Sequence, residues 1–526
     1  MAKVADKTQV QEVQVKTVGF AGGINNRDAP NMLAQNEARA IENIILEERG
    51  AASKRPGVLS MGTFGTSLNR VLSMYTYYRG ALAPQVIIHT TAGTLYYTND
   101  PTAQPIVWTQ IATGLSTSQP FSYETFNSKC YMSNGVDNYA AWDGSTWTVF
   151  PSAPKGKFLK LYKDTMWVSG IPATVDRVYQ SNPGDAETFG VASWVDIAHG
   201  DGDQVTALGS DGLTLIVFKR NRTFNIYDPT TYANRVIDFE KGCESHFSII
   251  QFESSVYFLS RRGICQYLGD APSRYLSYKI DPIFDPAVIN IANLNMVNAY
   301  LVGTRVGWAI PEVAQTQNTF QIEYYPRLAE RSPDQESVGI GPLTFQRMPG
   351  HFFSAYRYQA NDFLLAGSNQ ANKVYRCYAP AQGTDDGATF QGLIETGTMD
   401  FGVQDRTKYI RRMRFLGRGK TNALIKRNFE PSTYKTYLVD MSAGVVDLWS
   451  IADHWGVGSW GPGANVREDL VNTDAYGRYF ALRFVDAEVG TQKRPIAVGS
   501  LEYSVPTGEW TIFGILLDGV VLGVRS

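Results

Sequence analysis

Leu215-Ile216-Val217-Phe218 and Phe224-Asn225-Ile226-Tyr227 are two short apolar runs on either side of a polar turn. Runs of this length, rich in Val, Ile, Tyr and Phe and bounded by turn residues, indicate a pair of β-strands. From about residue 70 the same strand–turn–strand unit recurs, and its copies begin roughly 36 to 57 residues apart. That spacing is near the length of one four-stranded blade of a β-propeller. The unit occurs at residues 86–97, 130–142, 166–179, 215–227, 256–267, 306–322 and 363–376.

These hairpins predict a mostly β fold, with a β-propeller of about six to seven blades over residues 70–384. Beyond about residue 385 the strands are longer and the hairpin unit stops, which favours a β-sandwich-like C-terminal domain over residues 385–526. Residues 1–69 form an N-terminal segment before the first repeat.

Two local patterns predict elements outside the repeat. In residues 34–45, Asn36 can cap a helix, and Ala38 and Ile41 would share one helical face, so we expect one short helix in the N-terminal segment. Near the C-terminus, Asp518-Gly519 interrupts an apolar run. Because Asp-Gly is a preferred two-residue hairpin turn, we expect the chain to reverse there.

The composition excludes several classes of protein. The 526 residues carry 48 Lys and Arg against 50 Asp and Glu, so neither a polybasic nor a polyacidic class of protein is indicated. Charged residues are 19% of the chain, below the ~25% of an average soluble protein. We interpret this low charged fraction as a sign that part of the surface is covered by other subunits in an assembly. Disordered, collagen-like and disulfide-scaffold classes do not fit. The N-terminus lacks a signal-peptide pattern and the longest apolar run is too short to cross a bilayer, so we expect a cytoplasm-made protein with no membrane-spanning segment.

Signals of catalysis are almost absent. The chain has five histidines, no two of them at metal-ligand spacing, and no P-loop, G-x-S-x-G or H-E-x-x-H motif. We therefore expect no enzymatic activity, no cofactor and no metal site. The four cysteines are widely spaced without a C-x-x-C pair, which favours reduced core residues: Cys130, Cys243, Cys265 and Cys377.

Two acidic turns keep narrower alternatives open. Gly200-Asp201-Gly202-Asp203 could touch calcium, but it does not supply the six to eight oxygen ligands of a calcium loop, so a turn is favoured. Asp143-Gly144-Ser145-Thr146-Trp147 is similar to the sialidase Asp-box. It lacks the residue between Asp and Gly and occurs once, which favours a hairpin turn. A glycosidase would need two carboxyl groups that the fold brings together, and the sequence leaves that open.

The strongest charge feature is the basic run at residues 406–420. On a strand, Lys408, Arg412 and Arg414 would project opposite Tyr409 and Met413. One interpretation is a solvated strand face. The other is contact with DNA phosphates or with an acidic surface of a partner.

The most specific segments lie near the N-terminus. They read Gly22-Gly23-Ile24-Asn25-Asn26-Arg27-Asp28-Ala29-Pro30, then Glu37-Ala38 and Asn43, then Arg49-Gly50-Ala51 and Lys54-Arg55-Pro56-Gly57. Together they resemble the opening of the β-propeller tail proteins of tailed bacteriophages, including the nozzle or tail-stabilisation proteins of short-tailed phages. Further similar segments are residues 131–138, 177–185, 202–208 and 256–264.

The resemblance implies a structural virion protein of the phage tail, made in the host cytoplasm. It implies a homohexameric ring below the portal and adaptor proteins, with a lumen through which viral DNA passes, and contacts with tail fibres, spikes or a plug. A near-neutral chain is consistent with such a conduit, because a strongly basic lumen would hold DNA through its phosphates. If the basic strand faces the lumen, we expect acidic residues near it.

Two other functions remain as alternatives. One is another propeller-bearing tail protein, such as a hub, neck or stopper protein. The other is a propeller glycosidase acting on host surface sugars, which a paired-carboxylate cleft would favour.

Overall fold

The structure, a computed structural model, describes residues 11–47, 50–329, 340–368, 370–380, 382–401, 407–427, 435–441, 467–486 and 511–521. The chain divides into two compact units. The propeller unit comprises residues 57–324 and 347–386, and the two-sheet unit comprises residues 1–56, 325–346 and 387–526. The boundaries expected at residues 69 and 384 are therefore corrected. The strands at residues 11–18, 37–42 and 52–54 pair with C-terminal strands and belong with them, and residues 57–69 belong to the propeller.

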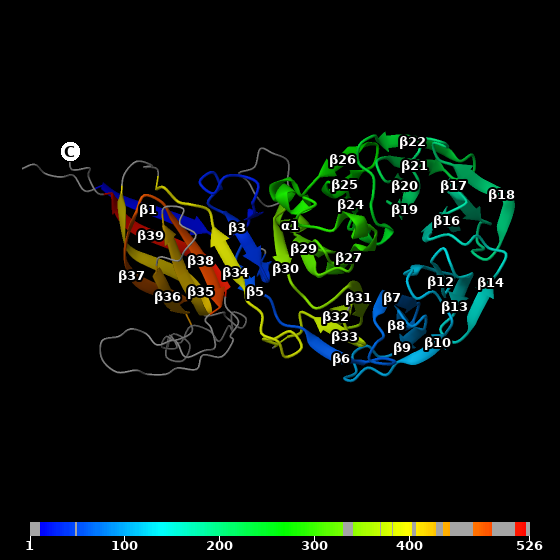
Figure 1. Cartoon of the computed structure of the whole chain (residues 1–526), viewed down its shortest axis with the longest axis horizontal. Helices are drawn as coiled ribbons and strands as arrows, with labels where there is room; N and C mark the ends of the chain where they lie inside the picture. The colour runs from blue at the N-terminus through cyan, green and yellow to red at the C-terminus, as the bar shows by residue number, and fades with distance from the viewer. Residues whose placement is uncertain are drawn as a thin grey trace, which may run out of the picture. The chain divides into compact units, whose positions relative to one another are not determined.

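Six four-stranded antiparallel sheets and one set of three antiparallel strands follow one another around a ring in the described part of the propeller unit (Figure 1). Each predicted hairpin supplies the second and third strands of one sheet, so the repeat and the blade count of six to seven are confirmed. Blade 1 consists of β7 (Val71–Arg79), β8 (Leu82–Thr90), β9 (Leu95–Thr98) and β10 (Thr109–Ala112). Blade 2 consists of β11 (Ser122–Phe126), β12 (Lys129–Ser133), β13 (Tyr139–Trp142) and β14 (Trp147–Phe150). Blade 3 consists of β15 (Phe158–Tyr162), β16 (Thr165–Ile171), β17 (Thr174–Ser181) and β18 (Phe189–Asp196).

The other four blades follow the same plan, with two 3-10 segments, η2 (Tyr278–Phe284) and η3 (Ile291–Met296), between blades 5 and 6. Blade 6 has three strands within this unit. Blade 4 consists of β19 (Val205–Ser210), β20 (Leu215–Lys219), β21 (Thr223–Asp228) and β22 (Ala233–Asp238), and blade 5 of β23 (Ile250–Phe252), β24 (Ser255–Ser260), β25 (Gly263–Leu268) and β26 (Ala271–Tyr275). Blade 6 consists of β27 (Asn298–Val302), β28 (Arg305–Ile310) and β29 (Phe320–Tyr324). Blade 7 consists of β31 (Phe352–Tyr358), β32 (Asn361–Gly367), β33 (Lys373–Cys377) and β6 (Leu59–Thr63).

The hairpin strands are continuous apolar runs because neighbouring blades cover both of their faces. In β20, Leu215 and Val217 pack in one buried cluster with Trp167 of blade 3. Ile216, which points the other way, packs in a second cluster with Phe258 of blade 5. The core is therefore a set of layers between blades, and each layer is filled by alternate residues of the same strands.

Blade 7 closes the ring with a strand from the start of the unit. β6 lies antiparallel to β33, with Lys373 opposite Thr63 and Arg376 opposite Leu59. Gly57, just before β6, lies so close to residue 384 that an added Cβ would be 2.1 Å from the Thr384 carbonyl oxygen. The two ends of the propeller unit are thus joined by backbone pairing.

One long strand, β35 (Lys408–Arg427), organises the two-sheet unit. Its first part pairs with β37 (Arg467–Gly477) and β39 (Thr511–Val521). Its second part pairs with β36 (Lys435–Met441) and β38 (Phe480–Asp486). Phe415 in the first part meets Phe484 of β38 edge to face, with 5.7 Å between ring centroids, so the two sheets share a core as in a β-sandwich. The other elements of this unit are β1 (Gln11–Val18), β2 (Gly23–Ile24), β3 (Glu37–Glu42), β4 (Ile44–Leu46), β5 (Ala52–Lys54), α1 (Pro326–Ala329), β30 (Leu343–Gln346), β34 (Leu393–Thr396), β36 (Lys435–Met441), β37 (Arg467–Gly477), β38 (Phe480–Asp486) and β39 (Thr511–Val521).

The helix expected in residues 34–45 is wrong, because this segment forms β3 and β4. β3 pairs with β34, and its register shifts at a bulge between Ala38 and Ala40. The bulge places Ala38 and Ile41, three residues apart, on the buried side. A bulged strand therefore shows the spacing of an amphipathic helix, and its pairing with β34 overrides the local propensity.

The hairpin expected at Asp518-Gly519 is also wrong. β39 continues through these residues, and Asp518 pairs with Gln14 of β1 on one side and with Arg412 of β35 on the other. A strand that is paired on both sides gains backbone hydrogen bonds that a turn at this point would lose.

Candidate functional site

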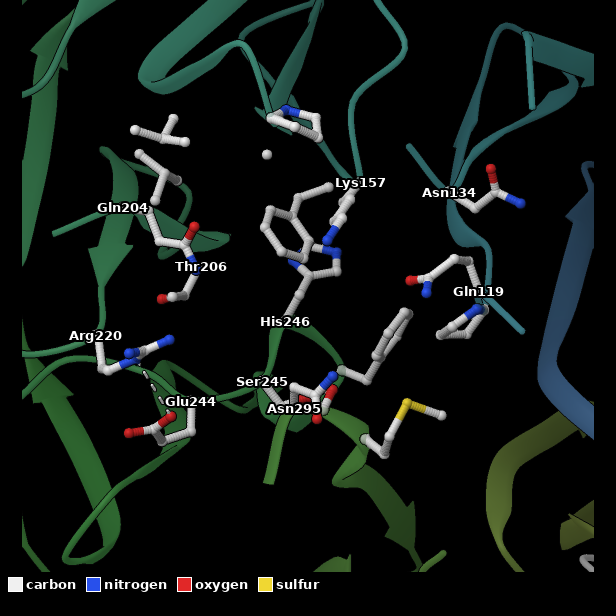
Figure 2. Close-up of a pocket in the computed structure, with 18 of the residues that line it drawn as sticks. Gln119, Asn134, Lys157, Gln204, Thr206, Arg220, Glu244, Ser245, His246 and Asn295 are labelled. Atoms are coloured by element: carbon white, nitrogen blue, oxygen red, sulfur yellow. Dashed lines mark hydrogen bonds and ion pairs between the residues drawn. The ribbon is translucent and has the colours of Figure 1, made fainter. Parts of the chain in front are cut away.

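Loops at one end of the propeller surround a cavity of about 650 Å³. Two sets of segments line it. One set leads into the first strands of blades 2 to 6, which are the inner strands of the ring, and the other set consists of turns between the second and third strands of blades 2 to 5. A cavity of this size lies within the range of ligand sites in proteins. Figure 2 shows His246 near the middle of the lining residues, with Gln204, Arg220 and Glu244 on one side and Gln119 on the other.

A 3-10 turn, η1 (His246–Ser248), fills the space between the inner strands. The strand that follows it, β23, is short, and η1 contacts β19 and β27. The Trp308 indole of blade 6 donates to the Ser248 carbonyl oxygen at 2.9 Å, and Phe247 packs edge-on against Phe352 of blade 7. His246 and Phe247 also line a second cavity of about 330 Å³ among the inner strands. The axial space is therefore divided at η1.

His246 joins two blades through one tautomer of its ring. Its Nδ1 accepts a hydrogen bond from the Leu208 backbone N–H of β19, at 3.3 Å. Nε2 lies 2.8 Å from the Ser122 hydroxyl of β11 and, since Nδ1 is the acceptor, carries the proton and donates it. Burial, and then the charge of Lys160, lower the pKa of His246 to about 3, so the ring stays neutral.

The Ser122–His246 pair is not arranged as a catalytic nucleophile and base. A base must accept the hydroxyl proton at its free ring nitrogen, but here that nitrogen already holds a proton. No carboxylate orients the ring, because its other nitrogen is held by a backbone N–H. Ser122 also accepts from the Leu159 N–H at 3.1 Å and is 1% exposed, so its role is structural.

Positive charge dominates the rim of the cavity. Arg220 and Arg261 occupy equivalent turns of blades 4 and 5, each directly after the second strand. Glu244 precedes blade 5, and its carboxylate lies 4.0 Å from the Arg220 Nε, the ion pair drawn in Figure 2. Burial raises the pKa of Glu244, while Arg220 and Arg261 act in the opposite direction. With Lys157, the lining residues carry three cations and one carboxylate.

A single carboxylate does not make a glycosidase centre at this cavity. Hydrolysis of a glycosidic bond uses two carboxyl groups facing each other across the bond. Glu244 is the only Asp or Glu among the residues that line the cavity. Asp143, in the Asp-box-like segment, lies elsewhere, in the turn between β13 and β14, where its side chain accepts from the Ser145 and Thr146 N–H groups.

The acidic turn at residues 200–203 receives a lysine ammonium group. Lys219 is fully buried, and its Nζ lies 2.6 Å from Asp201 and 2.9 Å from Asp176. The same ammonium also donates to the Ala198 carbonyl oxygen. Burial by itself would raise the pKa of Asp201, but the hydrogen bond from Lys219 is among the contacts that hold it below the usual value. Residues 200–203 therefore form a turn, as expected from the sequence, and this turn is built around the Lys219 ammonium group.

The three basic residues predicted as a contact face do not lie on one face. Lys408 is buried, and its Nζ donates to the Arg478 carbonyl oxygen at 2.6 Å, whereas Arg412 and Arg414 are exposed. The register of β35 shifts between Ile410 and Arg412, so the inside-outside alternation is reversed after the bulge. The expected face is thus corrected to Arg412 and Arg414, and the register pairs Arg412 with Asp518.

The N-terminal segments that carry the family resemblance lie mostly in the two-sheet unit, where Asn25, Asn43 and Arg55 are buried. The Asn25 side-chain amide donates to Glu37 and to Asp28, each at 2.9 Å. The Arg55 guanidinium is 1% exposed, donates to the Asn43 side chain at 3.1 Å, and lies over the Phe390 ring. These polar residues therefore fix the path of the chain before it enters the propeller.

The remaining chemical groups have structural surroundings. All four cysteines are buried free thiols, as predicted. Across the part of the chain that the structure describes, His, Cys, Asp and Glu side chains do not gather in threes as metal ligands would. None of the helices among these residues has the length and hydrophobicity that crossing a membrane requires.

No family model and no curated protein sequence matches the chain. Solved structures do match it. YCF48 bound to a D1 peptide and BBS1N in complex with ARL6DN each have a TM-score of 0.37 and 12% identity, over 62% of this chain and 98% of theirs. Raptor of Chaetomium thermophilum has a TM-score of 0.38 and 11% identity, over 62% of this chain and 29% of its own. The assignment as a propeller rests on the strand pairing described above.

Proposed function

We propose that this chain is a structural protein of a bacteriophage tail, which forms a nozzle-type ring that extends the DNA ejection channel below the portal and adaptor. The observation that carries the proposal is the N-terminal run at residues 22–57, which resembles the opening of propeller-bearing tail proteins. In the structure Asn25 of this run donates to Glu37, and Arg55 donates to Asn43, which is compatible with a scaffold.

The closed axis of the propeller shapes this proposal. η1 lies among the inner strands, held by blades 2, 4, 6 and 7, and we infer that it leaves double-stranded DNA no path through one propeller. A channel would therefore form between copies of the chain around a ring, as a closed cyclic assembly provides. The proposed partners are other copies of this chain, the portal and adaptor, and tail fibres, spikes or a plug.

Arg412 and Arg414 are the residues proposed to face DNA or a partner. Both are exposed on β35, and Lys408 is excluded because it is buried. In the strand register Asp518 is opposite Arg412, a position at which an acidic residue is expected if this face lines the lumen.

Copy number tests the proposal directly. In purified virions of the encoding phage, quantitative mass spectrometry should find this chain at half the copy number of the portal protein. A different ratio would favour the second candidate, a hub, neck or stopper protein, and absence from virions would contradict a tail role.

A further inference from the structure

The rim of the axial cavity carries more positive than negative charge. Arg220 and Arg261 come from equivalent turns of adjacent blades, and both act on Glu244, which lies in the connection between those blades. Lys157 adds a third cation from the segment before blade 3. All three cationic residues are exposed, whereas the Glu244 side chain is 12% exposed.

The chemistry of the cavity matches an anionic chain with several separate charges. Its three cations are contributed by three different blades, so a ligand with a single charge would meet only part of the set. Gln119, Gln204 and Asn295 also line the cavity, and their amides can both donate to and accept from peptide groups. The two aromatic rings in the lining pack against other rings, Phe158 against His246 and Phe247 against Phe352.

We propose that this cavity is a docking site for an acidic peptide segment of a partner protein, whose carboxylates pair with Arg220, Arg261 and Lys157. Arg side chains bind carboxylates through paired hydrogen bonds, and such charge-assisted bonds strengthen where water is partly excluded. Glu244 competes for the same guanidinium groups, so it acts as an internal stand-in for the ligand carboxylate. The site does not depend on the tail role, because it follows from the charges of the cavity alone.

The test is a binding titration of the full chain by calorimetry at low salt. The probe is a capped triglutamate peptide, and the matched control is capped triglutamine. We expect binding of the first only, weakening as salt is raised. Arg220→Gln and Arg261→Gln should each reduce the affinity about fivefold, while Arg262→Gln, a change at the exposed neighbouring residue outside the cavity lining, should leave it unchanged.

Glu244→Gln provides the sharper variant, because removal of the competing carboxylate should raise the affinity about fivefold. A purely structural role of Glu244 would give no such gain. The proposal is overturned if triglutamate does not bind, if Arg262→Gln weakens binding as much as Arg261→Gln does, or if free glutarate binds as tightly as the peptide. Thermal melts of all variants check that each one is folded.

Discussion

The two units are assembled from opposite kinds of strand pairing. In the propeller unit each strand pairs mainly with the next strand in the sequence, as β8 does with β9. In the two-sheet unit the pairing joins distant segments, with Gln11 of β1 opposite Val521 of β39. Local hairpins close short loops, whereas distant pairs must first close long ones. The propeller should therefore tolerate loss of the chain ends, and the two-sheet unit should not.

The largest effect is expected from truncation. A chain that stops at residue 510 loses β39, which pairs with β1, β5 and β35. We expect the two-sheet unit to become susceptible to limited proteolysis while the two propeller segments, residues 57–324 and 347–386, stay protected. Rapid digestion of both units would show that the propeller depends on its neighbour.

A smaller but still large effect is expected from Lys219→Met inside the propeller. The change leaves the carboxylates of Asp176 and Asp201 without their buried counter-ion, so the free energy of unfolding should fall by about 3–5 kcal/mol in urea titrations. Arg222→Met is the control: Arg222 also contacts Asp201, but from the exposed side, and should cost less than about 1 kcal/mol. Equal losses would contradict a buried ionic centre.

Acid should weaken the propeller through its buried histidines. Burial lowers the pKa of His89 and of His351 to about 4, and that of His246 to about 3. In the unfolded chain these rings bind protons near pH 6.5, so the unfolded state is favoured as the pH falls below that value. Between pH 7 and pH 5 we expect a loss of about 1–2 kcal/mol per ring in the free energy of unfolding.

Two histidine variants sharpen the pH experiment. His351→Gln, which can still accept from the Asn318 N–H, should remove the share of one ring from the pH dependence. His89→Gln should likewise remove the share of one ring, because burial lowers the pKa of His89 to about 4. A pH dependence that His351→Gln does not change would contradict the neutral buried ring.

The smallest effect on stability is expected on the exposed face of β35. Arg412→Gln with Arg414→Gln should change the free energy of unfolding by less than about 0.5 kcal/mol, because both side chains are exposed. If this face contacts DNA or a partner, phage carrying the double variant should lose infectivity at unchanged protein stability. Unchanged infectivity would favour the solvated strand face.

Whether an element could be predicted from the sequence also depends on whether its strands pair with near or with distant segments. The blade hairpins could be predicted because residues 215–227 carry both strands and their turn within one short segment. The helix at residues 34–45 and the single face of Lys408, Arg412 and Arg414 could not be predicted correctly, since a bulge fixed by a distant partner strand changes the side-chain alternation.

The axial cavity was missed for a related reason. Arg220 and Arg261 follow the second strand of consecutive repeats, and an alignment of the repeats would have shown that they share a position. His246 carries no comparable signal, because its partners on β11 and β19 are set by the ring of blades and not by neighbouring residues.

A cryo-EM reconstruction of the tail of the encoding phage tests the central claim most directly. We predict density below the portal and adaptor with six copies of the seven-bladed unit around the channel, each with its own axis closed at η1. DNA density along the axis of a propeller, or a tail without this chain, would contradict the account.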